Sequence, residues 1–207
     1  QAIVNPNVEG DAFPSKPLAG VGVIFYGLLA LRAQLRAIHW FSEHHMIEPN
    51  LAQLLDLVAL GTIADVVPLD YVNRILVFQG LSRIKSGHCC VGINSLIEIS
   101  GRNPKTLSAT DLGFAIGPRL NAAGRLDDMA LGIECLLSSD PIESKQMAQQ
   151  LDHLNKERKE IEAQMKSSAL SILATLSDVE ANATQSAVCL YDQQWHQGVI
   201  GILASRI

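Results

Sequence analysis

The sequence predicts an α/β protein that is mostly helical and in which one long helix joins parts of two domains. Between residues 18 and 137, apolar side chains recur at helical spacing. After Pro141, about 36 residues contain neither Pro nor Gly, which corresponds to a helix of roughly 54 Å. Residues Ser186–Tyr191 then alternate as a strand does, and Gln197–Ile207 begins another helix. We expect a first domain at 1–137, a connecting helix at 138–180 and the start of a second domain at 181–207.

Four helices are expected in the first half of the chain. Residues 1–17 are expected to form the end of a strand and a proline-rich loop, and residues 39–50 a polar loop. The pair Pro49-Asn50 is a start signal for the second helix, and Gly61-Thr62 is a stop signal. The expected helices are Leu18–Ile38, Leu51–Leu60, Asn73–Ile84 and Gly92–Ile99.

The elements after residue 100 are predicted from their capping residues. Ser108-Ala109-Thr110-Asp111 is a capping-box pattern that opens a helix to about Ala115. Gly117–Arg125 is expected to be a loop, followed by a helix over Asp128–Leu137. Asp140-Pro141-Ile142-Glu143 provides the long helix with an N-cap, a Pro at its first position and a carboxylate at its third.

Composition excludes several classes of protein. Hydrophobic residues make up 48% of the 207 residues and charged residues 18%, which is enough for a packed core. The net charge of −5 excludes a uniformly basic nucleic-acid-binding surface but allows a local basic patch. No apolar run approaches the roughly 18 residues that span a bilayer, and no signal peptide is visible. The four cysteines lack zinc-site spacing, so we expect reduced thiols in a cytoplasmic protein.

The two ends of the sequence suggest a piece of a longer protein. The chain begins without Met, and it ends inside an apolar helical pattern that has no stop signal. We therefore expect that residues of the complete protein precede Gln1 and follow Ile207.

The first candidate functional residue is Asp65. It is a lone carboxylate in an apolar segment, just after the Gly61-Thr62 turn. Burying such a carboxylate is costly unless it is paired or binds a cation. The structural interpretation is that Asp65 caps the next turn, and the functional interpretation is that it is a ligand of a hard divalent cation.

The second candidate segment is Gly117–Asp128, which contains Arg119, Asn121 and Arg125. Small residues allow a ligand to approach the backbone, and arginines bind phosphate oxygens through two N–H groups. Residues 102–125 carry a local charge of about +3, from four basic residues and one acidic residue. The structural alternative is a tight turn in which the arginines pair with Asp127 and Asp128.

The third candidate segment is Trp195–Gly201, between the expected strand and the last helix. His196 could donate a hydrogen bond to a phosphate, the Gly198 backbone could approach an anion, and Trp195 could stack on a base. A plain strand–helix turn explains the same residues equally well. A fourth segment, Glu43-His44-His45, resembles a metal triplet, but its polar surroundings favour a solvated loop.

Taken together, the three segments resemble the RecJ-type exonucleases of the DHH phosphoesterase superfamily. The matching residues are Leu55–Leu69, Gly117–Asp128 and Trp195–Arg206, in this order and spacing. The resemblance covers essentially the whole chain, including Ile3–Asn7 and Phe13–Lys16. It implies the C-terminal part of a DHH domain at 1–137, a connecting helix, and the truncated start of a DHHA1 domain at 181–207.

The resemblance also implies an activity and roles for individual residues. Such enzymes digest single-stranded DNA from the 5′ end in recombination and repair, with two Mn²⁺ or Mg²⁺ ions in the cleft between the domains. Asp65 corresponds to a metal ligand. Arg119, Asn121 and Arg125 would bind backbone phosphates, and His196 and Gly198 would approach the strand from the DHHA1 side. Glu43-His44-His45 lies after the place of the family's Asp-His-His motif and does not correspond to it.

The resemblance further implies that this chain is incomplete as an enzyme. One aspartate cannot hold two cations, so the fragment by itself should be inactive and should not retain the ions. The expected partners are single-stranded DNA and other recombination and repair proteins, with no membrane. Two alternatives remain open: a related phosphodiesterase for short oligonucleotides or cyclic dinucleotides, and a non-catalytic binding scaffold.

Overall fold

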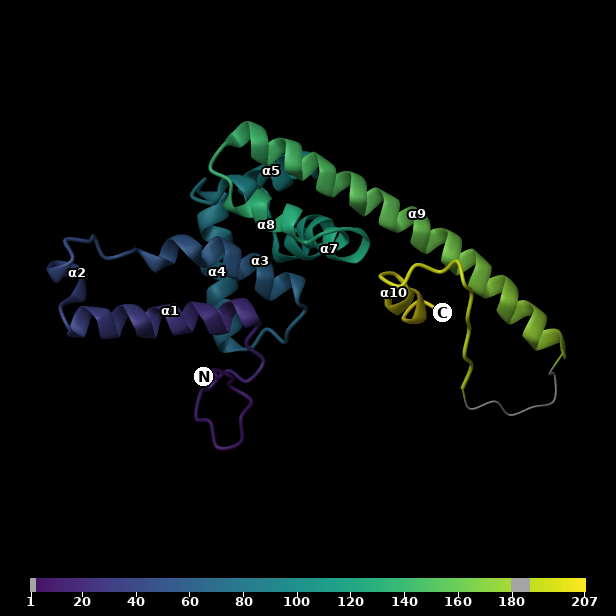
Figure 1. Cartoon of the computed structure of the whole chain (residues 1–207), viewed down its shortest axis with the longest axis horizontal. Coiled ribbons are helices and arrows are strands. Elements are labelled where there is room, and N and C mark those ends of the chain that lie inside the picture. The colour runs from purple at the N-terminus through teal and green to yellow at the C-terminus, as the bar shows by residue number, and fades with distance from the viewer. Residues whose placement is uncertain (1–2, 180–186) are drawn as a thin grey trace.

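The protein is mostly helical in a computed structural model that describes residues 3–179 and 187–207. A long helix, α9, extends from a group of shorter helices towards the C-terminal segment (Figure 1). The α-helices are α1 (Gly20–Ala37), α2 (Trp40–Glu43), α3 (Leu55–Ala64), α4 (Tyr71–Lys85), α5 (Val91–Ile99), α6 (Ala109–Asp111), α7 (Gly117–Leu126), α8 (Ala130–Leu137), α9 (Pro141–Val179) and α10 (Ile200–Ala204). Two 3₁₀ turns, η1 (Leu51–Leu54) and η2 (Pro104–Thr106), and a π-helical turn, η3 (Leu112–Ile116), complete the described elements.

Two hydrophobic clusters build the group of shorter helices. The smaller one joins α1, α3 and α4 through buried residues such as Phe25, Val58 and Leu76. At the crossing of α3 and α4, a Cβ atom on Gly80 would lie 2.1 Å from the carbonyl oxygen of Leu55, so this close approach requires glycine. The larger cluster joins α3, α4, α5, η3, α7 and α8 to the first half of α9.

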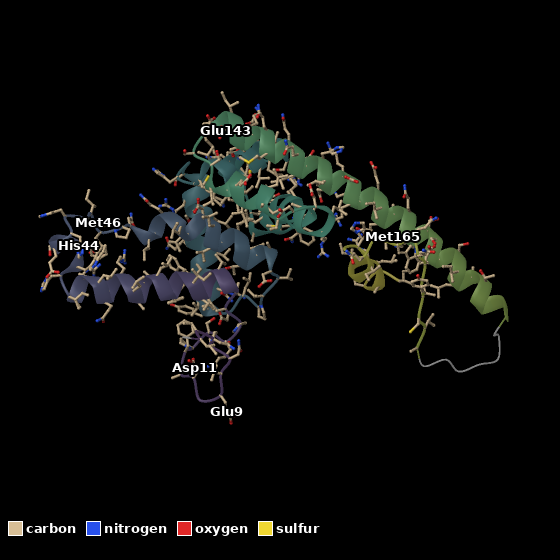
Figure 2. All side chains as sticks on the ribbon, in the orientation of Figure 1. Glu9, Asp11, His44, Met46, Glu143 and Met165 are labelled. Atoms are coloured by element: carbon tan, nitrogen blue, oxygen red, sulfur yellow. The ribbon has the colours of Figure 1, made fainter. Side chains whose placement is uncertain are left out.

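Helix α9 begins with the N-cap that the sequence predicts. The Asp140 carboxylate accepts hydrogen bonds from the backbone N–H groups of Ile142 and Glu143, at 2.7 and 3.3 Å. The helix has 39 residues and is therefore about 58 Å long. Glu143 marks its beginning and Met165 its second half in Figure 2. A third hydrophobic cluster lies there, where Met165 and Ala169 pack against Val199 and Leu203 of the C-terminal segment.

The expected loop at Gly117–Arg125 is wrong, because this segment is helix α7. The capping box at Ser108 and Asp111 is confirmed, and the helix it opens continues through the π-helical turn η3 into α7. Pro118 lacks an N–H group, and in a regular α-helix its ring would clash with the carbonyl four residues earlier. A π-helical turn just before Pro118 widens the backbone there and lets the helix continue.

Two other boundaries differ from the prediction. Gly61-Thr62 does not stop α3, which ends at Ala64. Gly61 instead allows α1 to pack closely, since a Cβ atom there would lie 2.8 Å from the side chain of Val21. Within the expected polar loop 39–50, residues Trp40–Glu43 form the short helix α2.

The C-terminal segment has less regular structure than expected. Residues 187–191 form no strand, and α10 covers only Ile200–Ala204 of the expected helix. An isolated strand is not stable without a neighbour, and none of the described segments pairs with this one. Helix α9 extends to Val179, within one residue of the expected end of the connecting helix at residue 180. Residues 180–186, including the first residue of the expected strand, Ser186, lie outside the described residues. No helix in the described ranges is long and apolar enough to cross a membrane.

Candidate functional site

A groove between the end of α3 and one face of α7 contains three of the predicted site residues. Asp65, Asn121 and Arg125 all line it, although Asp65 is more than fifty positions from the other two in the sequence. Its volume is about 830 Å³. The remaining lining residues are Val21, Leu57, Leu60, Gly61, Ala64, Leu120, Gly124, Met129 and Leu136. The groove is therefore apolar at its base, with one carboxylate, one amide and one guanidinium along it.

Asp65 lies at the C-terminal end of α3, and its carboxylate is exposed. No other group in residues 3–179 or 187–207 hydrogen-bonds to or pairs with this carboxylate. Asp65 does not cap the next turn, because the N-cap of α4 is Asp70, whose side chain accepts from the Asn73 N–H at 2.9 Å. The carboxylate oxygens of Asp65 thus remain available for a ligand in the groove.

The residue after Asp65 has a strained backbone. Val66 has a φ of 56°, in the left-handed region, and is 85% exposed. This conformation costs a non-glycine residue about 1–2 kcal/mol, and β-branched residues adopt it rarely. The left-handed residue follows the C-cap Asp65 directly, so it marks the point where α3 ends and the connection to α4 begins.

Asn121 and Arg125 are four residues apart on α7 and share its groove face. Arg119 lies off that face and binds α9 instead. Its Nε and Nη2 atoms lie 2.9 and 2.8 Å from the Asp152 carboxylate, and Nη1 donates to the carbonyl of Ala115. The structure therefore places Arg119 between α7 and α9, whereas Asn121 and Arg125 face the groove.

The Asp152 carboxylate is ionised in this arrangement at neutral pH. Burial alone would raise the pKa of Asp152, but a hydrogen bond from Lys156 and the positive charge of Arg119 outweigh it and hold the pKa below its ordinary value. Neither predicted arginine pairs with Asp127 or Asp128, and the Asp128 carboxylate instead accepts a hydrogen bond from the N–H of Ala130, the first residue of α8, at 2.8 Å.

The third predicted segment meets the same helix at Arg125. The Arg125 Nη1 atom donates to the carbonyl of Gly198 at 3.1 Å, and the Gly198 N–H donates to Nδ1 of His196 at the same distance. A Cβ atom on Gly198 would lie 2.1 Å from the Arg125 carbonyl oxygen, so only glycine fits this contact. Trp195 is half-buried and packs against the third cluster, and its indole N–H is buried without a partner.

The other candidate metal ligands lie elsewhere or are chemically unsuited. His44 stacks on Trp40 at the α2 end of the molecule, and Figure 2 shows it well away from α7. Burial raises the pKa of Cys89 to about 12 and that of Cys90 to about 11, so both thiols are protonated at neutral pH. Within the described part of the chain, no group of three or more His, Cys, Asp or Glu side chains could hold a metal ion.

The sequence did not indicate the roles of two aspartates that stabilise the fold. The buried Asp56 carboxylate accepts hydrogen bonds from the backbone N–H groups of Leu57 and Cys90, at 2.8 and 2.7 Å, and ties α3 to the start of α5. Asp152 is the partner of Arg119 although it lies 33 residues further along. No local pattern indicates either role, because each depends on a contact between helices that are distant in sequence.

The chain was compared with families and proteins of known identity. No protein-family model matches the chain. The single-stranded-DNA-specific exonuclease RecJ of Dickeya dadantii is 57% identical over all 207 residues, and RecJ of Escherichia coli is 55% identical over the same length. The whole length of this chain is similar to RecJ proteins.

Solved RecJ structures share the fold. The crystal structure of RecJ from Thermus thermophilus in complex with Mg²⁺ matches 98% of this chain with a TM-score of 0.76 and 34% identity, over 29% of its own chain. A crystal structure of RecJ bound to manganese matches 97% of this chain with a TM-score of 0.75 and 34% identity, over 46% of its own chain. The present chain spans 36% of the length of the Dickeya and Escherichia RecJ proteins.

Proposed function

We propose that this chain is part of a RecJ-type exonuclease that digests single-stranded DNA from its 5′ end in recombination and repair. The observation that supports it most strongly is the convergence of the three motif segments. Asp65 and Arg125 line one groove, and Arg125 binds the backbone of Gly198. Asp65 and Arg125 are 60 positions apart in the sequence, and Arg125 and Gly198 are 73 apart. A purely local turn function for each segment would not require them to meet.

The donor chemistry of the groove is consistent with one ligand of a metal centre. The Asp65 carboxylate is unpartnered among the described residues, and oxygen is the ligand that Mg²⁺ and Mn²⁺ prefer. We propose that it supplies one ligand to a centre of two such ions and that residues outside this sequence supply the others. When bound, the ions would activate water and stabilise charge on the scissile phosphate. The 207-residue piece alone would not retain them.

The remaining groove residues would hold the DNA backbone. The Arg125 guanidinium keeps N–H groups free beside its one bond to Gly198, and it would donate them to a phosphate. Asn121, one turn earlier on the same face, would orient that phosphate through its amide. His196 and Gly198 would approach the strand from the C-terminal side, while Arg119 would act through the position of α7.

The domain assignment follows from the same proposal. Residues 1–137 would be the C-terminal part of a DHH domain, 138–180 the connecting helix and 181–207 the start of a DHHA1 domain. The strand that a DHHA1 domain should begin with would form only when its neighbouring strands are present. Single-stranded DNA would be the main partner, alongside other repair proteins in the cytoplasm.

The test is metal-dependent digestion of single-stranded DNA by the full-length protein and its Asp65→Asn variant. We expect the variant to lose activity by at least about a hundredfold, because the amide removes the charge that a hard cation requires. Glu43→Gln is the matched control, since Glu43 is an exposed carboxylate outside the groove, and it should retain full activity. Full activity in Asp65→Asn would contradict the proposal, and a preference for dinucleotides over long strands would favour a short-oligonucleotide phosphodiesterase.

A further inference from the structure

The connection between α3 and α4, residues 65–70, is held in place mainly by helix α4. Within the connection itself, the backbone makes few bonds: Asp65 N–H donates to Gly61, Val66 N–H to Ile63 and Asp70 N–H to Pro68. Val66 is in the left-handed region and largely exposed, so the connection has no packing of its own there. A strained, exposed connection keeps one shape only if surrounding groups fix it.

Asn73 provides that fixation from the first turn of α4. Its side-chain Nδ2 atom donates to two proline carbonyls, that of Pro68 at 2.9 Å and that of Pro17 at 3.0 Å. Both acceptors are carbonyl oxygens, so the amide can be oriented in only one way. A single side chain therefore ties the connection after Asp65 to the loop that precedes α1.

The burial of Asn73 shows that the two donated bonds are the reason for an amide at this position. The residue is 0% exposed, and its Oδ1 atom is buried without a partner. Leaving an acceptor unpaired in the interior is costly, and a leucine, which has the same branching as asparagine and no polar atoms, would avoid that cost. The asparagine is favoured here only if its two N–H groups are needed.

A second tie comes from the neighbouring residue on the exposed side. The Arg74 Nε atom donates to the carbonyl of Leu69 at 2.7 Å. Pro68 and Leu69 are thus both bound by α4, three and four residues after Asp65. Since α3 fixes the other side of Asp65, its carboxylate is held between two anchored segments.

We infer that Asn73, supported by Arg74, is a positioning residue that holds the Asp65 carboxylate at the groove for cation binding. The inference rests on the proposed metal-ligand role of Asp65. Asn73 lines none of the groove, so it would act only through the connection. Removing the two N–H donors of Asn73 makes the connection more mobile. The Asp65 carboxylate then occupies the cation-binding position for a smaller fraction of the time.

The experiment uses the full-length protein with Mn²⁺ as the probe. Calorimetric titration should show Mn²⁺ affinity about tenfold lower in Asn73→Leu, as is typical when a group behind a metal ligand is removed. In the same variant, amide exchange should accelerate in the peptide covering 64–70. The Arg74 side chain is exposed, so Arg74→Gln should lower Mn²⁺ affinity and accelerate exchange at 64–70 by smaller factors. This variant provides the test if Asn73→Leu does not fold.

Two further variants separate the possible outcomes. Ile93→Ala removes a buried side chain of the large cluster on α5, outside α3, α4 and the connection, and should lower stability without changing Mn²⁺ affinity or exchange at 64–70. If Asp65→Asn loses Mn²⁺ binding while Asn73→Leu and Arg74→Gln bind as well as the unmodified protein, the positioning role is wrong. If Asp65→Asn itself binds Mn²⁺ normally, the metal-ligand proposal fails and the positioning role fails with it.

Discussion

Replacing Gly198 by alanine should detach the C-terminal segment from α7. The new Cβ atom would lie 2.1 Å from the Arg125 carbonyl oxygen and 3.0 Å from its carbonyl carbon, and both are backbone atoms that cannot rotate away. The two segments must therefore separate. Separation breaks the hydrogen bond from Arg125 to the Gly198 carbonyl and loosens the contacts of Val199 with α9.

The expected cost follows from these two losses. Forced overpacking costs about 1–3 kcal/mol, and the net loss of a hydrogen bond from a charged group adds about 1.5 kcal/mol or more. A total of roughly 2.5–4.5 kcal/mol corresponds to an increase of about 60- to 1,600-fold in the population of the detached segment. Hydrogen–deuterium exchange of the peptides covering 195–204 in the full-length protein measures that population.

Gly201→Ala is the matched control for this prediction. A Cβ atom on Gly201 meets nothing within 4 Å, and alanine stabilises a helix relative to glycine. Exchange in the same peptides should therefore stay unchanged or slow down. Equal exchange in Gly198→Ala and the unmodified protein would refute the close approach of α7 and the C-terminal segment.

Three further predictions concern α9, the capping box and the strained valine. Asp152→Asn should destabilise the protein by about 1–2 kcal/mol at neutral pH. The folded pKa of Asp152 is lowered from 3.8, so the stabilisation by its carboxylate is present above that pH and is lost as the pH falls through the folded value. The thermal unfolding temperature of the unmodified protein should therefore fall as Asp152 is protonated, and Asp152→Asn should not show this part of the fall. Ser108→Ala should cost about 1 kcal/mol and speed amide exchange at 109–112, whereas Thr110→Ala should leave it unchanged. Val66→Gly should raise the free energy of unfolding in denaturant by up to about 1 kcal/mol, and Val66→Ala should give no gain because its Cβ atom keeps the strain.

Local signals predict most of the helices but not the way they join. The helices at α1, α4, α5 and α9 agree with the prediction within a few residues because apolar periodicity and caps such as Asp140 act locally. The loop expected at Gly117–Arg125 is wrong because the π-helical turn before Pro118 is an adjustment that residue preferences do not encode. The expected strand at 186–191 depends on neighbouring strands, which sequence periodicity within this chain cannot supply.

The candidate site was predictable in its residues but not in its geometry. Residue chemistry selected Asp65, Asn121 and Arg125, and the structure brings all three to one groove. Residue chemistry could not distinguish the role of Arg119 from that of Arg125. Arg119 pairs with Asp152, which lies on a helix that begins later in the chain. Asn73 was expected only as the start of a helix, since its role depends on carbonyls at Pro17 and Pro68 that the fold brings to it.

The most direct test of the account is to locate Mn²⁺ by anomalous diffraction from crystals of the full-length protein. We predict a manganese ion bound by an Asp65 carboxylate oxygen at about 2.1 Å, with Arg125 on the same side of the groove. Manganese sites that all leave the Asp65 carboxylate uncoordinated would contradict the assignment of this groove as part of the nuclease centre.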